Sequence, residues 1–303
     1  MDIKNKVVNL AGRIRYGIIV EWYNFWYLAL RKKTQIVPHI ASIDETIETI
    51  QTLKASISRF GDGEMRLIDG HGIGFQTYNS ELSQRLLGIL HSNEDKHLVC
   101  LADTFSDLYK YNRKARRFWR TYFYMHGNLW DKHLDPNKTY YNAFVTRLYM
   151  DYASKEKCKE WFANIKKIWN DRDIIFIEGE KSRLGVGNDL FDNAKTIKRI
   201  LCPATNSYDK YELILSRASQ EDKTTLFLIA LGPTATVLAY DLYKRGYQAI
   251  DAGHMDVEYE WWKMGAKRKI KLAQKYVNEA AGGNQVEECA GDEYEKQIIH
   301  RIV

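Results

Sequence analysis

The chain has 303 residues, 45% of them hydrophobic and 28% charged, which suits one large globular domain or two modest ones. Its net charge of +6 is mild, and its basic residues are dispersed or lie in short clusters between acidic ones. That distribution suits anionic small molecules or a membrane surface and argues against a nucleic-acid partner. The four cysteines form no C-x-x-C pair, which argues against a disulfide framework or zinc site and favours a reducing compartment.

Residues 1–40 are predicted to form an N-terminal helical extension. Its segment 14–30 is rich in aromatic and aliphatic side chains and is closed by Arg31, Lys32 and Lys33. This pattern fits a helix lying on anionic lipid, and it fits equally well a helix packed on the domain or on a second subunit. No signal peptide and no spanning stretch of ~20 apolar residues is recognisable. The expected location is the cytoplasm, with any membrane contact peripheral, at the inner face of the plasma membrane.

From residue 41 to 284 the sequence predicts one domain in which helices alternate with short apolar strands. The expected helices cover residues 46–54, 81–91, 113–130, 189–198, 208–219 and 235–244. The expected strands cover residues 55–60, 98–102, 174–177, 199–204, 226–231 and 247–252. This alternation is typical of a Rossmann-like α/β fold, a doubly wound and mostly parallel sheet with helices on both faces. Residues 285–303 are predicted to be a C-terminal tail.

Ligands of such sheets bind beyond the carboxyl ends of the strands, and four of the predicted strand ends carry polar or glycine-rich segments. The first contains Asp62 and Glu64, which alternate in a glycine-flanked turn and share one side of an extended chain. Gly61 and Gly63 allow a sharp bend and close approach to a ligand. Carboxylate pairs of this kind suit Mg²⁺ or Mn²⁺ shared with a diphosphate, and the plain alternative is a solvated acidic turn.

The second segment runs from Gly179 to Asn188. Gly185 and Gly187 precede a predicted helix, whose N-terminal N–H groups could receive a phosphate. The G-x-G-x-x-G pattern fails at Leu190, which argues against a standard dinucleotide site. Lys181 and Arg183 could supply positive charge to a diphosphate, or they could belong to a solvated loop.

The third and fourth segments follow the last two predicted strands. Gly232-Pro233-Thr234 opens a helix with proline at its first position. His254, Asp256 and Glu260 follow the final strand, where a histidine beside carboxylates could act as a base or could be a hydrogen-bonded structural residue.

Together these segments resemble the bacterial GT-D-type glycosyltransferases. The resemblance rests on Arg59 to Glu64, Gly179 to Asn188, Leu231 to Ala235 and Asp251 to Glu260, in that order, and spans roughly residues 46–269. It implies a Rossmann-like, metal-dependent hexosyltransferase that uses a UDP-sugar and Mn²⁺ or Mg²⁺. The acceptor would be a glycan or glycoconjugate in bacterial exopolysaccharide or glycoprotein synthesis.

The resemblance also implies roles for individual residues. Asp62 and Glu64 would hold the metal, and His254 and Glu260 would serve catalysis. Beside the resemblance, Asp256 lies within sequence reach as a further candidate for the base, and we favour a direct displacement with inversion over retention, although the separation of the carboxylates does not follow from the sequence. The expected donor-binding residues are Arg59, Gly61, Gly63, Gly179, Glu180, Arg183, Gly185, Gly187, Asn188, Gly232, Pro233 and Thr234.

Two other classes of protein remain open on the sequence. One is another nucleotide-dependent α/β enzyme, an epimerase or a methyltransferase, because a fold does not fix a function. The carboxylate pair argues against a methyltransferase, whose cofactor needs no metal. The other class is a non-catalytic module that stabilises a partner glycosyltransferase.

Overall fold

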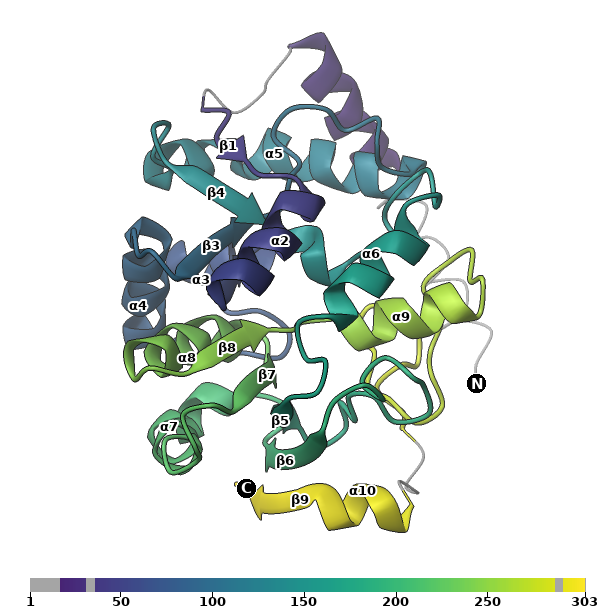
Figure 1. Ribbon diagram of the computed structural model, residues 1–303. Helices are drawn as coiled ribbons and strands as arrows, with labels where there is room; N and C mark the ends of the chain where they lie inside the picture. Colours follow the sequence, from purple (N-terminus) through teal and green to yellow (C-terminus); the bar gives the residue numbers. More distant parts are fainter. Residues whose placement is uncertain (1–16, 31–35, 287–290, 303) are drawn as a thin grey trace, which may run out of the picture.

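The computed structural model describes residues 17–30, 36–286 and 291–302 (Figure 1). Its centre is a nine-stranded sheet with the order β1-β4-β3-β2-β8-β7-β5-β6-β9. The strands are β1 (His39–Ile40), β2 (Ser56–Phe60), β3 (His97–Leu101), β4 (Thr139–Asn142), β5 (Asp173–Gly179), β6 (Thr196–Cys202), β7 (Leu226–Ala230), β8 (Gln248–Asp251) and β9 (Ile298–Arg301). Each pairing between these strands is parallel, so their carboxyl ends meet at one edge of the sheet.

Helices cover both faces of the sheet. The α-helices are α2 (Ile43–Leu53), α3 (Asp62–Ile68), α4 (Ser80–His91), α5 (Arg113–His133), α6 (Cys158–Lys166), α7 (Tyr211–Ala218), α8 (Pro233–Lys244), α9 (Met255–Lys263) and α10 (Asp292–Gln297). Two 3₁₀ turns, η1 (Ala143–Thr146) and η2 (Ser207–Lys210), complete the set. Helices α4, α7 and α8 lie together on one face, and α2, α6 and α9 lie on the other (Figure 1). The predicted doubly wound α/β fold is therefore confirmed.

Local sequence explains several of these elements. Helix α2 begins with a capping box, in which Ser42 and Glu45 satisfy each other's backbone N–H groups at 3.1 and 2.7 Å. Strands β3 and β7 are continuous apolar runs that are buried along almost their whole length, as expected for strands covered on both faces. Helix α8 has Pro233 at its start, where no backbone donor is needed.

The prediction of a helix over residues 189–198 was wrong. The chain makes successive turns after β5, and β6 already begins at Thr196. Leu190 and Phe191 are buried, and Phe191 packs against Trp169 and Phe176 with ring centroids 4.9 and 4.8 Å apart. Tertiary packing of these two side chains therefore overrides the helical tendency of the surrounding polar residues.

The expected extended turn at Asp62 and Glu64 was also wrong, because both residues lie in the first turn of α3. The predicted tail at residues 285–303 contributes α10 and β9, and β9 pairs with β6 at the edge of the sheet. The division of the chain into residues 1–40, 41–284 and 285–303 stays a prediction.

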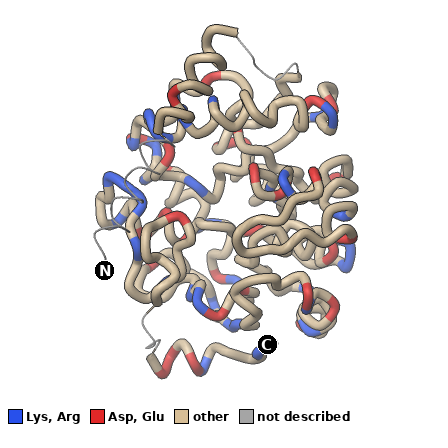
Figure 2. The backbone as a smooth tube through the Cα atoms, turned by 180° about the vertical axis from the view of Figure 1, so that it is seen from behind, with Lys and Arg blue, Asp and Glu red and all other residues tan. Residues whose placement is uncertain are grey.

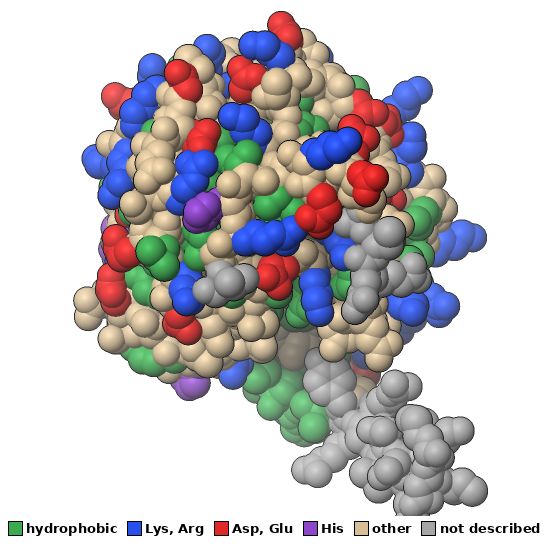
Figure 3. Space-filling model, turned by 90° about the horizontal axis from the view of Figure 1, so that it is seen from below, with side chains coloured by type: hydrophobic (Ala, Val, Ile, Leu, Met, Phe, Trp, Pro, Cys, Tyr) green, Lys and Arg blue, Asp and Glu red, His purple; other side chains and the backbone are tan. Residues whose placement is uncertain are grey.

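The N-terminal extension contains a helix over residues 17–29, which packs on α5. The predicted helical residues 14–16 and the basic cluster Arg31, Lys32 and Lys33 lie outside the described residues. Among the helices that the structure describes, none combines the length and apolarity needed to cross a membrane. Basic and acidic residues are mixed along the backbone (Figure 2) and over the face seen from below (Figure 3).

Candidate active site

A cavity of about 550 Å³ lies at the carboxyl ends of the central strands. Residues that follow β2, β5, β7 and β8 all line it, together with η1, the first half of α5 and the segment 276–279. Its volume falls within the range of small-ligand sites in proteins. The sequence placed the site at this edge of the sheet, and the cavity lies there.

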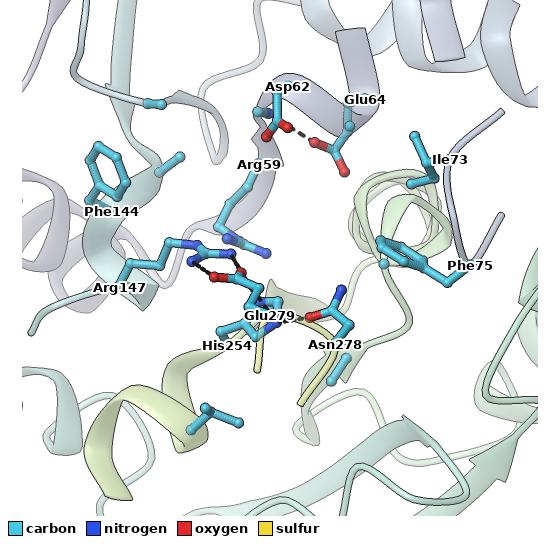
Figure 4. A pocket seen from close by; sticks show the side chains of 18 of the residues that line it. Arg59, Asp62, Glu64, Ile73, Phe75, Phe144, Arg147, His254, Asn278 and Glu279 are labelled. Carbon is cyan, nitrogen blue, oxygen red and sulfur yellow. Dashed lines mark hydrogen bonds and ion pairs between the residues drawn. The ribbon is translucent and has the colours of Figure 1, made fainter. Parts of the chain in front are cut away.

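The two carboxylates of the D-x-E motif face this cavity from the start of α3 (Figure 4). Gly61 is the N-cap of the helix, and its N–H group donates to Glu64 Oε2 at 2.9 Å. Asp62 is open to the cavity, whereas Glu64 is partly buried. Neither side chain belongs to an ion pair among the described residues. Two carboxylates without a cationic partner therefore stand side by side in the cavity wall.

The surroundings of both carboxylates disfavour their negative charge. Burial, and next the nearby negative charge of Asp251, raise the pKa of Glu64 to about 7. Partial desolvation by the cavity walls raises the pKa of Asp62, although its side chain remains open to the cavity. A cation placed between the two side chains would relieve both effects.

These residues therefore fit a divalent cation. Among the residues that the structure describes, no group of three or more His, Cys, Asp or Glu is arranged to hold a metal. Mg²⁺ commonly binds through only one or two carboxylates and takes its other ligands from water and substrate phosphates. Asp62 and Glu64 supply such a pair of hard oxygen ligands.

Arg59 lies between the carboxylate pair and the cluster of Arg147, Glu279 and His254 (Figure 4). Its guanidinium group donates from Nη2 to Asp251 Oδ1 at 2.8 Å and from Nε to the Asp251 carbonyl at 3.0 Å. The guanidinium also lies against Gly253, where an added Cβ would come within 1.9 Å of Nη2. Gly253 has a φ of +47°, so both its backbone conformation and its neighbour select glycine. Arg59 is thereby fixed at the cavity wall.

A second charged cluster surrounds Arg147, which follows η1. Arg147 forms a bidentate pair with Glu279, and Lys269 binds the same carboxylate. These positive charges hold the pKa of Glu279 well below its usual range, against the opposing effect of burial. Asp151 lies 3.4 Å from Lys269 Nζ. The cluster ties the segment that carries Glu279 to the cavity wall.

His254 is held by this cluster at both ring nitrogens. Arg147 Nη2 lies 3.1 Å from Nδ1, so Nδ1 is the acceptor, and Nε2 donates to Asn278 Oδ1 at 3.0 Å. Burial, and next the positive charge of Arg147, lower the pKa of His254 to about 4. His254 is therefore a neutral imidazole at neutral pH. Both ring nitrogens are therefore engaged within the protein, the Nε2–H group by Asn278 and the Nδ1 lone pair by Arg147.

Asp256 and Glu260 lie one turn apart on α9 and share the ammonium group of Lys275, at 2.6 and 3.0 Å. Asp256 lines the cavity but is almost fully buried, whereas Glu260 lies outside the lining residues. Asn188 Nδ2 binds both carboxylates, at 2.7 and 2.8 Å. Each acid is therefore bound by Lys275 and Asn188, and a catalytic role for either stays a prediction.

The same network reaches into the loop after β5, for which donor binding stays a prediction. Gly179 lines the cavity, but Glu180, Arg183, Gly185, Gly187 and Asn188 do not. The Gly185 N–H group donates to Asp256 Oδ1 at 3.1 Å, and Arg183 Nη1 donates to the Gln274 carbonyl at 3.1 Å. Without a helix at residue 189, the loop presents no helix N-terminus to a phosphate. The polar groups of Arg183, Gly185 and Asn188 bind other parts of the protein.

The loop after β7 also has residues that line the cavity and residues that do not. Gly232 lines the cavity with a φ of +56°, and an added Cβ would come within 2.6 Å of the Phe75 ring. Pro233 and Thr234 are buried in the first turn of α8 and do not line the cavity. Arg59, Gly61 and Gly63 do line it, as the sequence predicted.

Several residues of the cavity had not been predicted. They are Phe75, Lys114, Phe118, Trp119, Arg147, Asp151, Gly253, Lys269, Asn278 and Glu279. Gly253 lies inside a motif that the sequence analysis singled out, and Lys269 belongs to a visible basic run. Arg147 and Glu279 had no local signal, since each follows a segment without clear periodicity.

Comparison with known proteins identifies the family of the chain. Residues 57–280 match the family model described as the glycosyltransferase GT-D fold. The chain belongs to this family. The match covers the D-x-E motif, the cavity and all four segments on which the resemblance rested.

Two solved structures agree closely with this assignment. One is described as a new glycosyltransferase of domain family DUF1792 from Streptococcus sanguinis, with 38% identity and a TM-score of 0.84 over 88% of this chain and 100% of that one. The other, domain of unknown function 1792, is described as having a distinct glycosyltransferase fold. It is 41% identical, with a TM-score of 0.84, over 88% of this chain and 96% of that one.

Two curated relatives carry the same enzyme class in their names. The chain is 42% identical over 267 residues to the probable glycosyl transferase Gly of Streptococcus gordonii, covering 87% of this chain. It is 38% identical over 276 residues to the glycosyltransferase GlyD of Streptococcus pneumoniae serotype 4, covering 90% of this chain. The chain spans only 39% and 34% of the lengths of these relatives. The family model and the two solved structures, which this chain covers to 96% and 100%, confirm the predicted enzyme class, a glycosyltransferase.

Proposed function

We propose that the chain transfers a hexose from a UDP-sugar to a glycan or glycoconjugate acceptor of the bacterial surface, with the help of Mn²⁺ or Mg²⁺. One observation carries this proposal. A single cavity contains two carboxylates that lack a cationic partner, and it also contains guanidinium groups that are fixed in place. The carboxylates suit a divalent ion, and the guanidinium groups suit a diphosphate.

Asp62 and Glu64 would hold the metal ion in this proposal. When bound, a divalent ion supplies positive charge that stabilises the leaving nucleoside diphosphate. Asp251 and Gly253 already hold Arg59 in place. Its guanidinium group would contact the diphosphate from the side opposite Asp62 and Glu64. Gly61, Gly63, Gly179 and Gly232 would let the backbone approach the nucleotide.

Few side chains in or near the cavity wall are available to act on the acceptor hydroxyl. His254 supplies a neutral imidazole with Nε2 as donor, and Glu260 supplies a carboxylate that remains 13% exposed beside Lys275. We propose that both serve turnover more than donor binding, with Asp256 as their structural support and the next candidate for the base. An acceptor hydroxyl that displaced Asn278 from His254, or Lys275 from Glu260, would make these groups available to it.

The state of the cysteines bears on the cell compartment in which the protein works. Cys100, Cys158 and Cys202 are free and buried, which suits a reducing compartment, and we propose the cytoplasm.

The test is a calorimetric titration of UDP with and without Mn²⁺, on the wild-type chain and on Asp62→Asn. We expect Mn²⁺ to increase UDP affinity strongly in the wild type and hardly in the variant. Equal affinity in both conditions would overturn the metal role. A screen of nucleotide sugars for Mn²⁺-dependent release of UDP then identifies the donor, and turnover of a donor with another nucleotide would overturn the UDP assignment.

A further inference from the structure

The N-terminal helix presents an apolar face away from the protein. Ile18, Trp22 and Phe25 follow one another at intervals of four and three residues, so they lie on one side of the helix. Their side chains are 65, 58 and 61% exposed. Contiguous apolar surface of this kind is uncommon on a soluble domain without a partner.

The opposite side of this helix is the side that packs on the protein. Asn24 Nδ2 donates to the Arg117 carbonyl at 3.1 Å and to Thr121 Oγ1 at 2.9 Å, and Tyr27 is buried. The rings of Tyr23 and Tyr124 lie 5.2 Å apart. The contact with α5 therefore orients the helix with its apolar face outward.

Charge distinguishes the kinds of partner that could cover this face. Residues 1–33 contain seven basic and two acidic residues, a net charge of +5, whereas the other 270 residues contain 38 and 37, a net charge of +1. Glu21, the acidic residue within the helix, is paired with Arg117 at 2.6 Å. Nearly all of the net positive charge of the chain thus belongs to the segment with the exposed aromatic face.

We propose that this helix docks the enzyme on an anionic lipid bilayer. Tryptophan and phenylalanine insert at the boundary between headgroups and acyl chains, and nearby basic residues add attraction to anionic lipid. A second copy of the chain is disfavoured as the partner, because it would bring two positively charged segments together. A neutral protein surface would gain nothing from the charge.

The position of α5 gives the docking a consequence for the reaction, which rests on the proposed function. One side of α5 contacts the N-terminal helix through Arg117 and Thr121, and an adjacent side lines the cavity with Lys114 and Phe118. An enzyme held by this helix would keep its cavity close to the bilayer surface. The acceptor class that fits this arrangement is a saccharide carried on a lipid.

The test is flotation of the full-length chain with phosphatidylcholine vesicles, with and without 30% phosphatidylglycerol. The double variant Trp22→Glu/Phe25→Glu removes the apolar face, and Leu213→Glu is a matched control because Leu213 is 60% exposed on α7. Sedimentation velocity without vesicles reports the oligomeric state. UDP binding with Mn²⁺, measured on the same samples, tests the proposed function separately.

We expect the wild type and Leu213→Glu to float with anionic vesicles, less so at 0.5 M salt, and the double variant to bind at least tenfold more weakly. UDP binding should be the same in all three proteins. The proposal would be overturned if the wild type did not bind anionic vesicles, or if the double variant bound them as well as the wild type does. So would a wild-type dimer that the double substitution dissociates without any vesicle binding.

Discussion

The guanidinium group of Arg59 occupies the space that a side chain on Gly253 would need, since a Cβ there would lie 1.9 Å from Nη2. Arg59 lies in β2 and Gly253 comes just after β8, and these two strands are neighbours in the sheet. The absence of one side chain at residue 253 therefore sets the position of a charged group at residue 59.

Gly253→Ala should displace Arg59 and weaken UDP binding by about 10- to 100-fold, the cost of losing a charge-assisted hydrogen bond to phosphate. Gly246→Ala is the matched control. Gly246 also has a positive φ, of +84°, but an added Cβ there would meet no atom within 4 Å. Titration of UDP into both variants separates the effect on Arg59 from backbone strain, and equal losses in the two would contradict this role of Gly253.

Glu64→Gln should flatten the pH dependence of stability in the absence of metal. Burial raises the pKa of Glu64 to about 7 in the folded protein from an unfolded value near 4.5. The folded state therefore binds this proton more tightly, and its contribution to stability is complete below pH 4.5 and is lost as pH rises through 7. At pH 8 the variant should be more stable than the wild type by about 1–3 kcal/mol.

Denaturant unfolding between pH 4.5 and 8 measures this difference. Glu258→Gln is a useful comparison, because burial also raises the pKa of Glu258 to about 7 while its carboxylate binds the Tyr149 and Met150 N–H groups away from Glu64. Mn²⁺ at pH 8 should stabilise the wild type and the Glu258→Gln variant but not Glu64→Gln. A wild type that Mn²⁺ does not stabilise would count against the carboxylate pair as a metal site.

Asn188→Ala should destabilise the protein by about 1–3 kcal/mol and leave UDP affinity nearly unchanged. The side chain of Asn188 holds the loop after β5 to Asp256 and Glu260 and does not line the cavity. The two quantities are measured by denaturant unfolding and by calorimetry with UDP and Mn²⁺. A large loss of UDP affinity with unchanged stability would restore the original prediction that this residue binds the donor.

His254→Ala and Glu260→Gln should retain UDP affinity and lose about 10²- to 10⁴-fold in transfer rate, the range typical of acid–base groups. Both act on the acceptor side in our proposal, so their effect belongs to kcat. Steady-state kinetics alongside UDP titration gives this separation. If UDP binding is lost as well, the segment is a donor-binding or structural element, and near-normal kcat in both variants would move the base to another residue.

The sequence predicted those parts of the fold that carry local periodicity. Strands β3, β5 and β7 are unbroken apolar runs, and α8 has a clear start at Pro233, so all were found. Strand β4 reads Thr-Tyr-Tyr-Asn, which has no such run, and it was missed. The two glycines flanking Asp62 concealed α3, since glycine is a poor helix former.

The candidate site likewise contains residues that a local motif predicts and residues that only the fold brings together. Asp62, Glu64 and Arg59 belong to one short motif at a strand end, and the cavity lies where parallel-strand topology places it. The pair of Arg147 and Glu279 joins residues 132 positions apart, and no spacing rule connects them. Glycines and polar residues of the loop after β5 form internal hydrogen bonds, and a loop of this kind can have the same composition as a phosphate-binding loop.

Lys275 makes three positions of this chain interdependent. Its ammonium group is 2% exposed and neutralises both Asp256 and Glu260, so losing it would leave two carboxylates bound only by Asn188 and backbone groups. Buried charges of this kind are tolerated as a set and penalised when one member is lost. Relatives that keep Asp256 and Glu260 should therefore also keep a cationic residue at the position of Lys275.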